Sequence, residues 1–311
     1  MIKIKQYTPD NKTVWDNFID ASKNGTFMLK RDYMDYHSDR FTDFSLMFCD
    51  EDDLTAVMPA SLHGNEIRSH GGLTYGGIIS GNSMKQHRML ECFSILTEYL
   101  KNQGIKKLIY KAIPHIYHRQ PAEEDLYALF INNAKLFRRD VSTTVNLQAP
   151  LKMPKGRKAQ IARARREGVV TEESEDFKSF ITLENEILSE RHNTSAVHTA
   201  EELQLLKSRF PQQIRLWEAK QNDNLLAAAL LFEYDNLIHT QYMASNDTGR
   251  EIGALDLLIA TVIEKYCSDK KYLDFGISTE NEGKFLNTGL ISQKEGFGGR
   301  AIVYDFYELE L

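Results

Sequence analysis

Apolar and polar positions along the chain predict short strands and amphipathic helices. In the first half, apolar residues recur with helical spacing over residues 83–102, where Met89, Phe93 and Leu96 share one face. An alternating strand and a helix open the chain before it. Short apolar runs predict further strands at 44–49, 54–60, 65–69 and 106–112. This half therefore combines helices with a largely antiparallel sheet.

The second half repeats this order of elements. Apolar spacing predicts helices at 175–190, 199–209 and 254–267, and strands at 168–172, 213–220, 225–233, 236–244 and 271–275. Each half reads as a strand, two helices, three antiparallel strands, a loop, a helix and further strands. The repeat rests on element order alone, because residue-level similarity is slight. We expect an α/β (α+β) protein of two tandem domains, 1–150 and 151–311.

Composition narrows the class of protein. The 311 residues include 42% hydrophobic ones and carry a formal net charge of −6, which predicts a folded chain without general affinity for DNA. Cys49, Cys92 and Cys267 are odd in number and far apart, so neither a disulfide framework nor a metal motif is expected. The N-terminus lacks a signal-peptide pattern, and the apolar run 225–232 is too short to cross a membrane. These patterns predict a cytoplasmic protein without a transmembrane segment.

A basic segment lies between the halves. Seven basic residues and no acidic ones occur from Lys152 to Arg166, and acidic residues follow from Glu172. Two interpretations stay open. The segment is either an arm that recognises phosphate groups, with Arg163 and Arg165 among its contacts, or a solvated helix that packs beside the acidic stretch.

A polar, glycine-rich segment follows the last predicted strand of the second half. Residues 272–300 bring Glu280, Asn281, Lys294 and Arg300 close together in sequence among several glycines. Polar loops just past a strand's carboxyl end are where α/β proteins place binding chemistry. The segment therefore indicates a ligand site without naming a reaction.

The order of elements resembles that of the Fem-type (FemAB-like) acyltransferases, which join two GNAT-like domains. The resemblance covers nearly the whole chain and is carried by residues 158–168, 246–258, 273–276 and 294–298. It implies acyl or aminoacyl transfer to an amine, from a thioester or a tRNA ester, without a metal. No long coiled-coil-like insertion is present. Its absence favours a thioester donor, acetyl-CoA or another acyl-CoA, over tRNA.

In the GNAT family a Gln/Arg-x-x-Gly-x-Gly/Ala turn binds the donor's pyrophosphate at a helix N-terminus. The nearest match here begins at Arg250, with the small residue one position early. The predicted donor-binding residues are Gly249, Arg250, Gly253 and Ala254. Each glycine could instead serve only a tight turn.

Acyl transfer to an amine needs a base and a proton donor for the leaving group. The candidates are Glu280, His192 and Tyr242, although His192 could cap a helix and Tyr242 could be a core aromatic. The proposed acceptor-binding residues are Arg163, Arg165, His70, Tyr75, Asn281, Lys294 and Arg300.

We therefore expect an N-acyltransferase that uses an acyl-CoA. The expected acceptor is a small molecule: an amino sugar, a nucleotide-sugar or a cell-envelope precursor. In one version of the hypothesis it carries a phosphate group. Two alternatives remain. One is an aminoacyl-tRNA-dependent ligase with the basic segment as its RNA contact, and the other is a non-catalytic binding module.

Overall fold

The chain folds into two compact units in the computed structural model, which describes residues 2–51, 53–192 and 196–311, without the side chains of 190–192. Unit 1 contains residues 1–140, 279–285 and 303–311, and unit 2 contains 141–278 and 286–302. These units differ from the predicted split at 150/151. Strand β9 (Lys135–Asn146) runs from unit 1 into unit 2, and strand β17 (Arg300–Glu310) runs from unit 2 into unit 1. The two C-terminal segments that return to unit 1 are 279–285 and 303–311.

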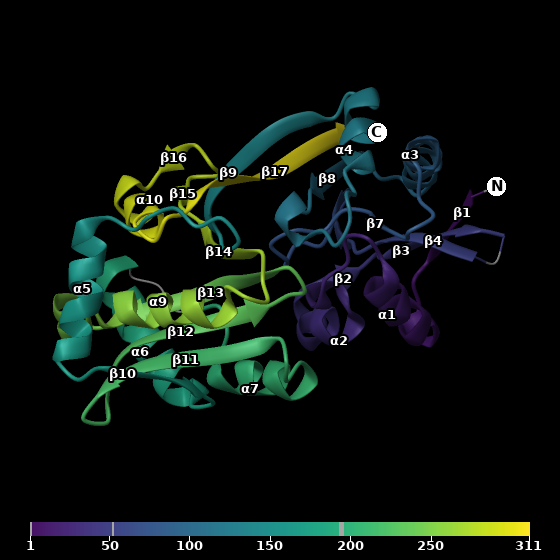
Figure 1. Ribbon diagram of the computed structural model, residues 1–311. Coiled ribbons are helices and arrows are strands. Elements are labelled where there is room, and N and C mark those ends of the chain that lie inside the picture. The colour runs from purple at the N-terminus through teal and green to yellow at the C-terminus, as the bar shows by residue number, and fades with distance from the viewer. Residues whose placement is uncertain (1, 52, 193–195) are drawn as a thin grey trace. The chain divides into compact units, whose positions relative to one another are not determined.

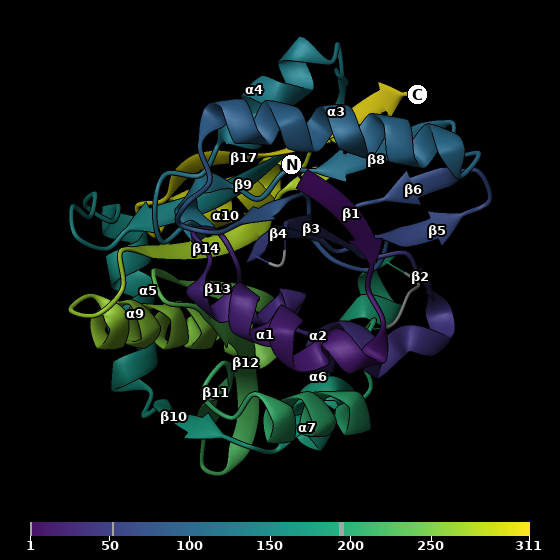
Figure 2. The ribbon, with the colours of Figure 1, turned by 90° about the vertical axis from the view of Figure 1, so that its right-hand side faces the viewer.

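Unit 1 contains a four-stranded sheet and part of a larger one (Figures 1 and 2). The first has the order β1 (Ile2–Gln6), β3 (Leu46–Asp50), β4 (Asp53–Met58), β7 (Ile79–Ser80). The second has the order β17, β8 (Lys107–Lys111), β6 (Glu66–Arg68), β5 (Ser61–His63), β2 (Thr42–Asp43). The helices are α1 (Lys12–Ala21), α2 (Arg31–Met34), α3 (Gln86–Asn102) and α4 (Glu124–Ile131).

The core of unit 1 forms where the apolar face of α3 meets the strands. Met89, Phe93 and Leu96 of this helix share one buried cluster with Phe48 of β3 and Leu108 of β8. The helix expected at 83–102 is thus observed as α3, and its predicted face is the buried one.

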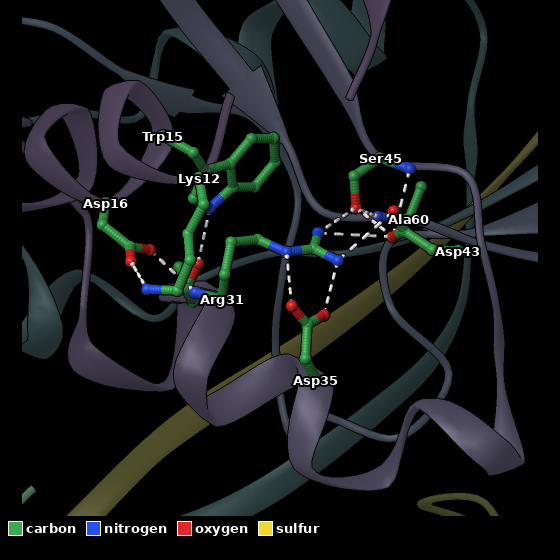
Figure 3. A network of polar contacts seen from close by, with 9 residues as sticks. Lys12, Trp15, Asp16, Arg31, Asp35, Asp43, Ser45 and Ala60 are labelled. Atoms are coloured by element: carbon green, nitrogen blue, oxygen red, sulfur yellow. Dashed lines mark hydrogen bonds and ion pairs between the residues drawn. The ribbon is translucent and has the colours of Figure 1, made fainter. Parts of the chain in front are cut away.

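A buried arginine organises the α1–α2 corner of unit 1 (Figure 3). The Arg31 guanidinium donates to Asp35 at 2.6 Å and to Ser45 at 3.1 Å, and it lies 3.9 Å from the ring centroid of Tyr7. Asp16 of α1 accepts the Arg31 backbone N–H at 2.8 Å. Because a buried charge needs partners, this network fixes how α2 packs on α1. We assign it a structural role.

Unit 2 is built on a sheet with the order β10 (Val170–Ser174), β11 (Ile214–Gln221), β12 (Asn224–Glu233), β13 (Leu237–Ser245), β14 (Tyr272–Ile277), β9. Neighbouring strands are antiparallel except β13 and β14, which are parallel. The helices are α5 (Lys155–Arg166), α6 (Phe177–His192), α7 (Ala200–Arg209), α8 (Asp247–Ile252), α9 (Ala254–Tyr266) and α10 (Thr288–Glu295). The short strands β15 (Thr279–Glu280) and β16 (Phe285–Leu286) follow β14 in the chain.

Helices α9 and α5 share one core with this sheet. Leu258 and Val262 of α9 lie in a buried cluster with Ala227 and Ala229 of β12 and with Ile161 of α5. Small side chains on β12 leave room for the bulky residues of α9, which favours close packing of helix on sheet. One sequence expectation was wrong in detail: the stretch 245–253, expected to be a loop, is largely helix α8.

Candidate functional site

The parallel strands β13 and β14 pair at one end only. Leu237 pairs with Tyr272, Ile238 with Leu273 and His239 with Asp274. Beyond these three pairs β13 continues to Ser245 and β14 to Ile277 without further pairing between them. The strands therefore open into a splay, where backbone groups on the facing edges can serve a ligand.

A β-bulge lies beside this opening. In the β12–β13 ladder Leu230 pairs with Tyr242 and Leu231 with Thr240, so Gln241 is the extra residue. Side chains alternate along a strand, and one inserted residue shifts that alternation. Ile238 and Met243 both pack with the core that contains α9. His239 and Tyr242 consequently share the opposite face of the sheet.

At the point where the strands separate, a buried carboxylate joins three strands. Asp274 Oδ1 accepts from the hydroxyls of Ser142 at 2.6 Å and Thr144 at 2.7 Å, both on β9. Asp274 Oδ2 lies 2.8 Å from His239 Nδ1 on β13 and accepts the Gly276 N–H at 3.3 Å. Burial opposes ionisation, but these hydrogen bonds prevail and lower the pKa of Asp274 to about 2. The network holds the apex of the splay in place.

Tyr242 occupies the middle of the opened strand, on the face shared with His239. Its hydroxyl lies 2.7 Å from His198 Nδ1, and its ring centroid is 6.3 Å from that of Phe180 on α6. A capping box at Thr199 starts α7 immediately after His198 and so fixes the position of that histidine. Burial raises the pKa of Tyr242 to about 12, so the phenol keeps its proton at neutral pH.

Glu184 lies on the same side of α6 as Phe180, one helical turn further on. Its side chain is buried, with the residue only 6% exposed. Desolvation raises the pKa of Glu184 to about 7, and its charge in turn contributes to raising the pKa of Tyr242. Tyr242 thus has two titratable neighbours: His198, within hydrogen-bond distance, and Glu184, whose charge acts on the phenol.

Comparisons with known proteins agree with this geometry. Residues 155–283 match the family model described as an acetyltransferase (GNAT) domain. The solved structure of FemX is similar over 99% of this chain and 97% of its own, with 12% identity and a TM-score of 0.69. The structure of L-PGS from Bacillus licheniformis covers 98% of this chain and 93% of its own at 13% identity, with a TM-score of 0.65. No curated protein sequence matches the chain.

The chain has a Fem-like tandem GNAT fold. A tandem GNAT protein from the clavulanic acid biosynthesis pathway is also similar, with 10% identity and a TM-score of 0.53 over 100% of this chain and 98% of that one. The GNAT match supports an acyltransferase, and it covers the strands that form the splay. The expected resemblance and fold class are confirmed.

The turn that was predicted to bind the donor packs against other residues of its own unit. Gly253 has φ of +82° and joins α8 to α9, and a Cβ there would lie 2.8 Å from the backbone oxygen of Gln160 on α5. The Gly253 N–H already donates to Gly249 O at 3.0 Å. Ala254 is fully buried, and Arg250 is bonded to Asp247 and to Ser245 O. All four predicted donor residues therefore make structural contacts, and donor binding by them stays a prediction.

The basic segment forms helix α5, whose cations fall into two groups. Arg157 pairs with Asp256 in the first turn of α9, and Arg163 donates to Glu251 O at 2.9 Å. By contrast, a second group is exposed and lies on the opposite side of the helix by its spacing. It comprises Lys155, Lys158, Arg165 and Arg166. We call these four residues the α5 cation stripe.

Two predicted acceptor residues of unit 2 are held close to the backbone. Lys294 is buried, and its ammonium donates to Gly276 O at 2.9 Å and Ile277 O at 2.7 Å at the end of β14. Burial lowers the pKa of Lys294 to about 8. Arg300 is exposed and donates to the neighbouring Gly299 O at 2.6 Å. Lys294 thus closes the end of β14, and its role toward a ligand stays a prediction.

The remaining predicted residues belong to unit 1, apart from His192, whose side chain lies outside the described residues. Tyr75 is fully buried and donates to Thr26 at 3.2 Å. His70 is buried, and desolvation lowers its pKa to about 3. Glu280 and Asn281 are exposed. Tyr75 and His70 are thus buried within their own unit, and acceptor binding by them stays a prediction.

Sequence reasoning missed Glu184, His198 and His239. Glu184 and His198 belong to different helical segments from Tyr242, and nothing in their spacing indicates that they meet. No sequence motif marks the segment around His239, which has the pattern of an ordinary strand. One available signal was that His239 interrupts an apolar strand, since a polar residue in a buried strand needs a partner.

A hollow of about 500 Å³ lies on another side of α6, where the helix begins. It is lined by Asp176, Lys178, Ser179, Thr182, Leu183, Glu186, Leu225 and Asn246. In the part of the chain described, no group of three or more His, Cys, Asp or Glu side chains is placed to hold a metal ion. Nor does any described helix have the length and apolar character needed to cross a membrane.

Proposed function

We propose that unit 2 transfers an acyl group from an activated ester or thioester to an amine, at the splay between β13 and β14. The observation that carries the proposal is the end of pairing after His239 and Asp274. It leaves an open strand edge beside the partly exposed Tyr242. The match of residues 155–283 to a GNAT domain supports the same assignment.

The chemistry follows from the groups at this edge. In the proposed reaction a neutral amine nitrogen attacks the acyl carbonyl carbon, and the bond from that carbon to the leaving oxygen or sulfur breaks. Backbone N–H groups of β13 near the bulge would stabilise the developing oxyanion. The Tyr242 phenol would give its proton to the leaving group and recover one through His198, 2.7 Å away. The amine nitrogen loses one proton as the amide forms, and this proton would pass to water at the open strand edge.

The contacts of α5 and α9 favour a donor other than acyl-CoA. A pyrophosphate bound as in the GNAT turn needs free N–H groups at the N-terminus of α9. Here Gly253 faces the backbone of α5, and the acidic Asp256 lies in that first turn. Meanwhile the α5 cation stripe is exposed and suits an anionic chain. We therefore favour an aminoacyl ester of RNA as donor, with acyl-CoA as the second candidate.

The acceptor remains the one proposed from the resemblance: an amino sugar, a nucleotide-sugar or a cell-envelope precursor. Relatives in fold include proteins named FemX and L-PGS, at 12% and 13% identity. At such low identity the likeness supports a shared fold only, so the acceptor has to be determined by experiment.

A comparison of donors tests this proposal. The chain is incubated with a mixture of amine acceptors and either an RNA pool carrying labelled aminoacyl esters or labelled acetyl-CoA, and label in new amide bonds is measured. We expect label from the RNA esters. In the double variant Lys158→Gln/Arg165→Gln the slope of log affinity for RNA against log salt should decrease by about 1.5.

The matched control is Lys3→Gln/Lys5→Gln, which removes two exposed cations of β1 in unit 1. It should leave the salt slope unchanged. Transfer from acetyl-CoA together with no transfer from RNA esters would contradict our choice of donor. It would instead favour acyl-CoA, with its pyrophosphate bound at the predicted donor turn.

A further inference from the structure

Helix α4 of unit 1 is apolar on two faces, and the described residues cover only one of them. Ala128 and Leu129 lie in the buried cluster that also contains residues of α3 and β8. The outer face carries Tyr127, Phe130 and Ile131, and Phe130 is 73% exposed. A surface helix normally has polar residues on its outer face, and a helix that is apolar all round is normally buried. The outer face of α4 therefore has the composition of a contact surface.

The exposed apolar surface continues past α4 into the start of β9. The two elements are joined by the turn 132–134, whose last two N–H groups donate to Phe130 O and Leu129 O, both at 3.0 Å. Leu136 and Phe137 follow this turn, and each is 43% exposed. At the spacing of residues in a strand, both lie within about 10 Å of the turn. We call the five exposed apolar residues around it the α4 patch: Tyr127, Phe130, Ile131, Leu136 and Phe137.

The area of the α4 patch indicates the size of its partner. A large apolar or aromatic side chain can bury about 150–250 Å². Each of the five exposes roughly half of its surface or more, so the patch presents about 500 Å². Patches of this size on single chains often have a function. Two copies packed patch to patch would bury about 1,000 Å², the lower limit for a specific protein interface.

Opposite charges lie at the two ends of the α4 patch. Glu123 directly precedes α4, and Lys135 is the first residue of β9 after the turn; both are exposed. The eight residues of α4 separate them by about 12 Å. A twofold axis that sets the α4 helices of two copies antiparallel would bring Glu123 beside Lys135 of the partner subunit. The patch is therefore complementary to itself in charge as well as in apolar character.

A lipid surface fits the α4 patch less well. Peripheral binding to anionic lipids needs a surplus of basic residues around the apolar side chains. Beside the patch, Arg138 and Arg139 of β9 are already paired with Asp140 and Asp305. The chain as a whole carries a formal net charge of −6. These charges favour a protein partner.

We propose that the α4 patch is the contact between two copies of this chain, which pair about a twofold axis with their α4 helices antiparallel. The aromatic rings of Tyr127 and Phe130, whose centroids lie 6.5 Å apart, form the centre of the contact. Glu123 and Lys135 close its two ends. The inference is independent of the proposed acyl transfer, because the contact lies in unit 1 and the splay lies in unit 2.

Sedimentation velocity of the full chain over a concentration series tests the contact. We expect the parent to form a reversible dimer with a dissociation constant in the micromolar range. Phe130→Asp places two carboxylates in the apolar contact and should raise that constant at least about 100-fold. Val14→Asp is the matched control, because Val14 is 49% exposed on α1, away from α4 (Figures 1 and 2). It should dimerise as the parent does, and circular dichroism checks that each variant is folded.

A charge swap tests the antiparallel arrangement. Glu123→Lys or Lys135→Glu alone brings like charges together and should raise the dissociation constant at least about tenfold, whereas the double swap should restore the parent value. A double swap that stayed as weak as the single variants would overturn the arrangement. A parent that is monomeric at every concentration, or a dimer that Phe130→Asp leaves intact, would overturn the contact itself. If a monomeric parent instead bound vesicles of phosphatidylglycerol, the patch would serve a lipid surface.

Discussion

At the scale of single residues, the site depends on where the extra residue of β13 falls. Gln241 shifts the alternation of the strand, so His239 and Tyr242, three positions apart, share a face. His239 is then able to meet Asp274 on β14, and Tyr242 to meet His198. Without the bulge, Tyr242 would face the apolar core shared with α9.

The stability of the protein should depend on pH through Glu184. The folded state raises the pKa of this carboxyl from 4.5 to about 7, so the folded state binds the proton more tightly than the unfolded state. Stability contributed by the protonated group is complete below pH 4.5 and is lost as pH rises to about 7. Relative to Glu184→Gln, the free energy of unfolding of the parent should fall by about 3 kcal/mol over this range.

Urea unfolding at a series of pH values measures this difference. Glu184 and Glu202 both act on Tyr242, which lies 2.7 Å from His198, so the comparison is made between parent and variant at each pH. Glu186→Gln is the control, because it removes an exposed carboxylate of the same helix, and it should track the parent. A parent and Glu184→Gln that differed by a constant amount across the range would contradict a raised pKa.

At the scale of elements, the packing of α5 on the junction of α8 and α9 decides how a donor can bind. Arg157 joins α5 to Asp256 of α9 and also donates to Gln293 O at 2.7 Å before α10 ends. Arg163 joins α5 to Glu251 of α8. These bonds direct two basic side chains toward α8 and α9, while the cation stripe is exposed. The helix is therefore both a packing element and a charged surface.

A glycine comparison tests this packing. Gly253→Ala should destabilise unit 2 by roughly 2–4 kcal/mol, because it adds strain at positive φ and a contact with the Gln160 backbone. Gly168→Ala is the control, since Gly168 has φ of +77° but no atom within 4 Å of a built Cβ. The Gly168→Ala variant should be less stable than the parent by about 1–2 kcal/mol, from strain alone. Equal losses in urea unfolding would show that α5 does not cover Gly253.

At the scale of the whole molecule, much of the fold could be predicted from the sequence. Helices α3 and α9 and strands β11–β13 follow apolar periodicity and lie close to where it places them. Helix α8 was missed, because its six residues include Gly249 and one apolar side chain, Ile252, which is too few to show an apolar face. The return of two C-terminal segments to unit 1 was not predicted either, because no local sequence pattern shows that a strand such as β17 belongs to both units.

The site could be predicted only in part. Tyr242 was proposed because it lies in the strand that leads to the predicted donor turn, and its catalytic role stays a prediction. Its partners were missed, because burial and register, rather than sequence spacing, bring His198 and Glu184 to that strand. The glycines of the predicted donor turn attracted attention for their conformational freedom, and at Gly253 the structure uses that freedom for packing on α5.

The central claim, acyl transfer at the splay in unit 2, is tested most directly by the single-turnover rate of amide formation in Tyr242→Phe. The variant removes one hydroxyl and keeps the ring that packs near Phe180. We predict a rate at least about 100-fold below that of the parent, with donor affinity unchanged. Tyr272→Phe, at the paired start of β14, should retain the parent rate. Equal rates in Tyr242→Phe and the parent, or no amide from any donor, would contradict the account.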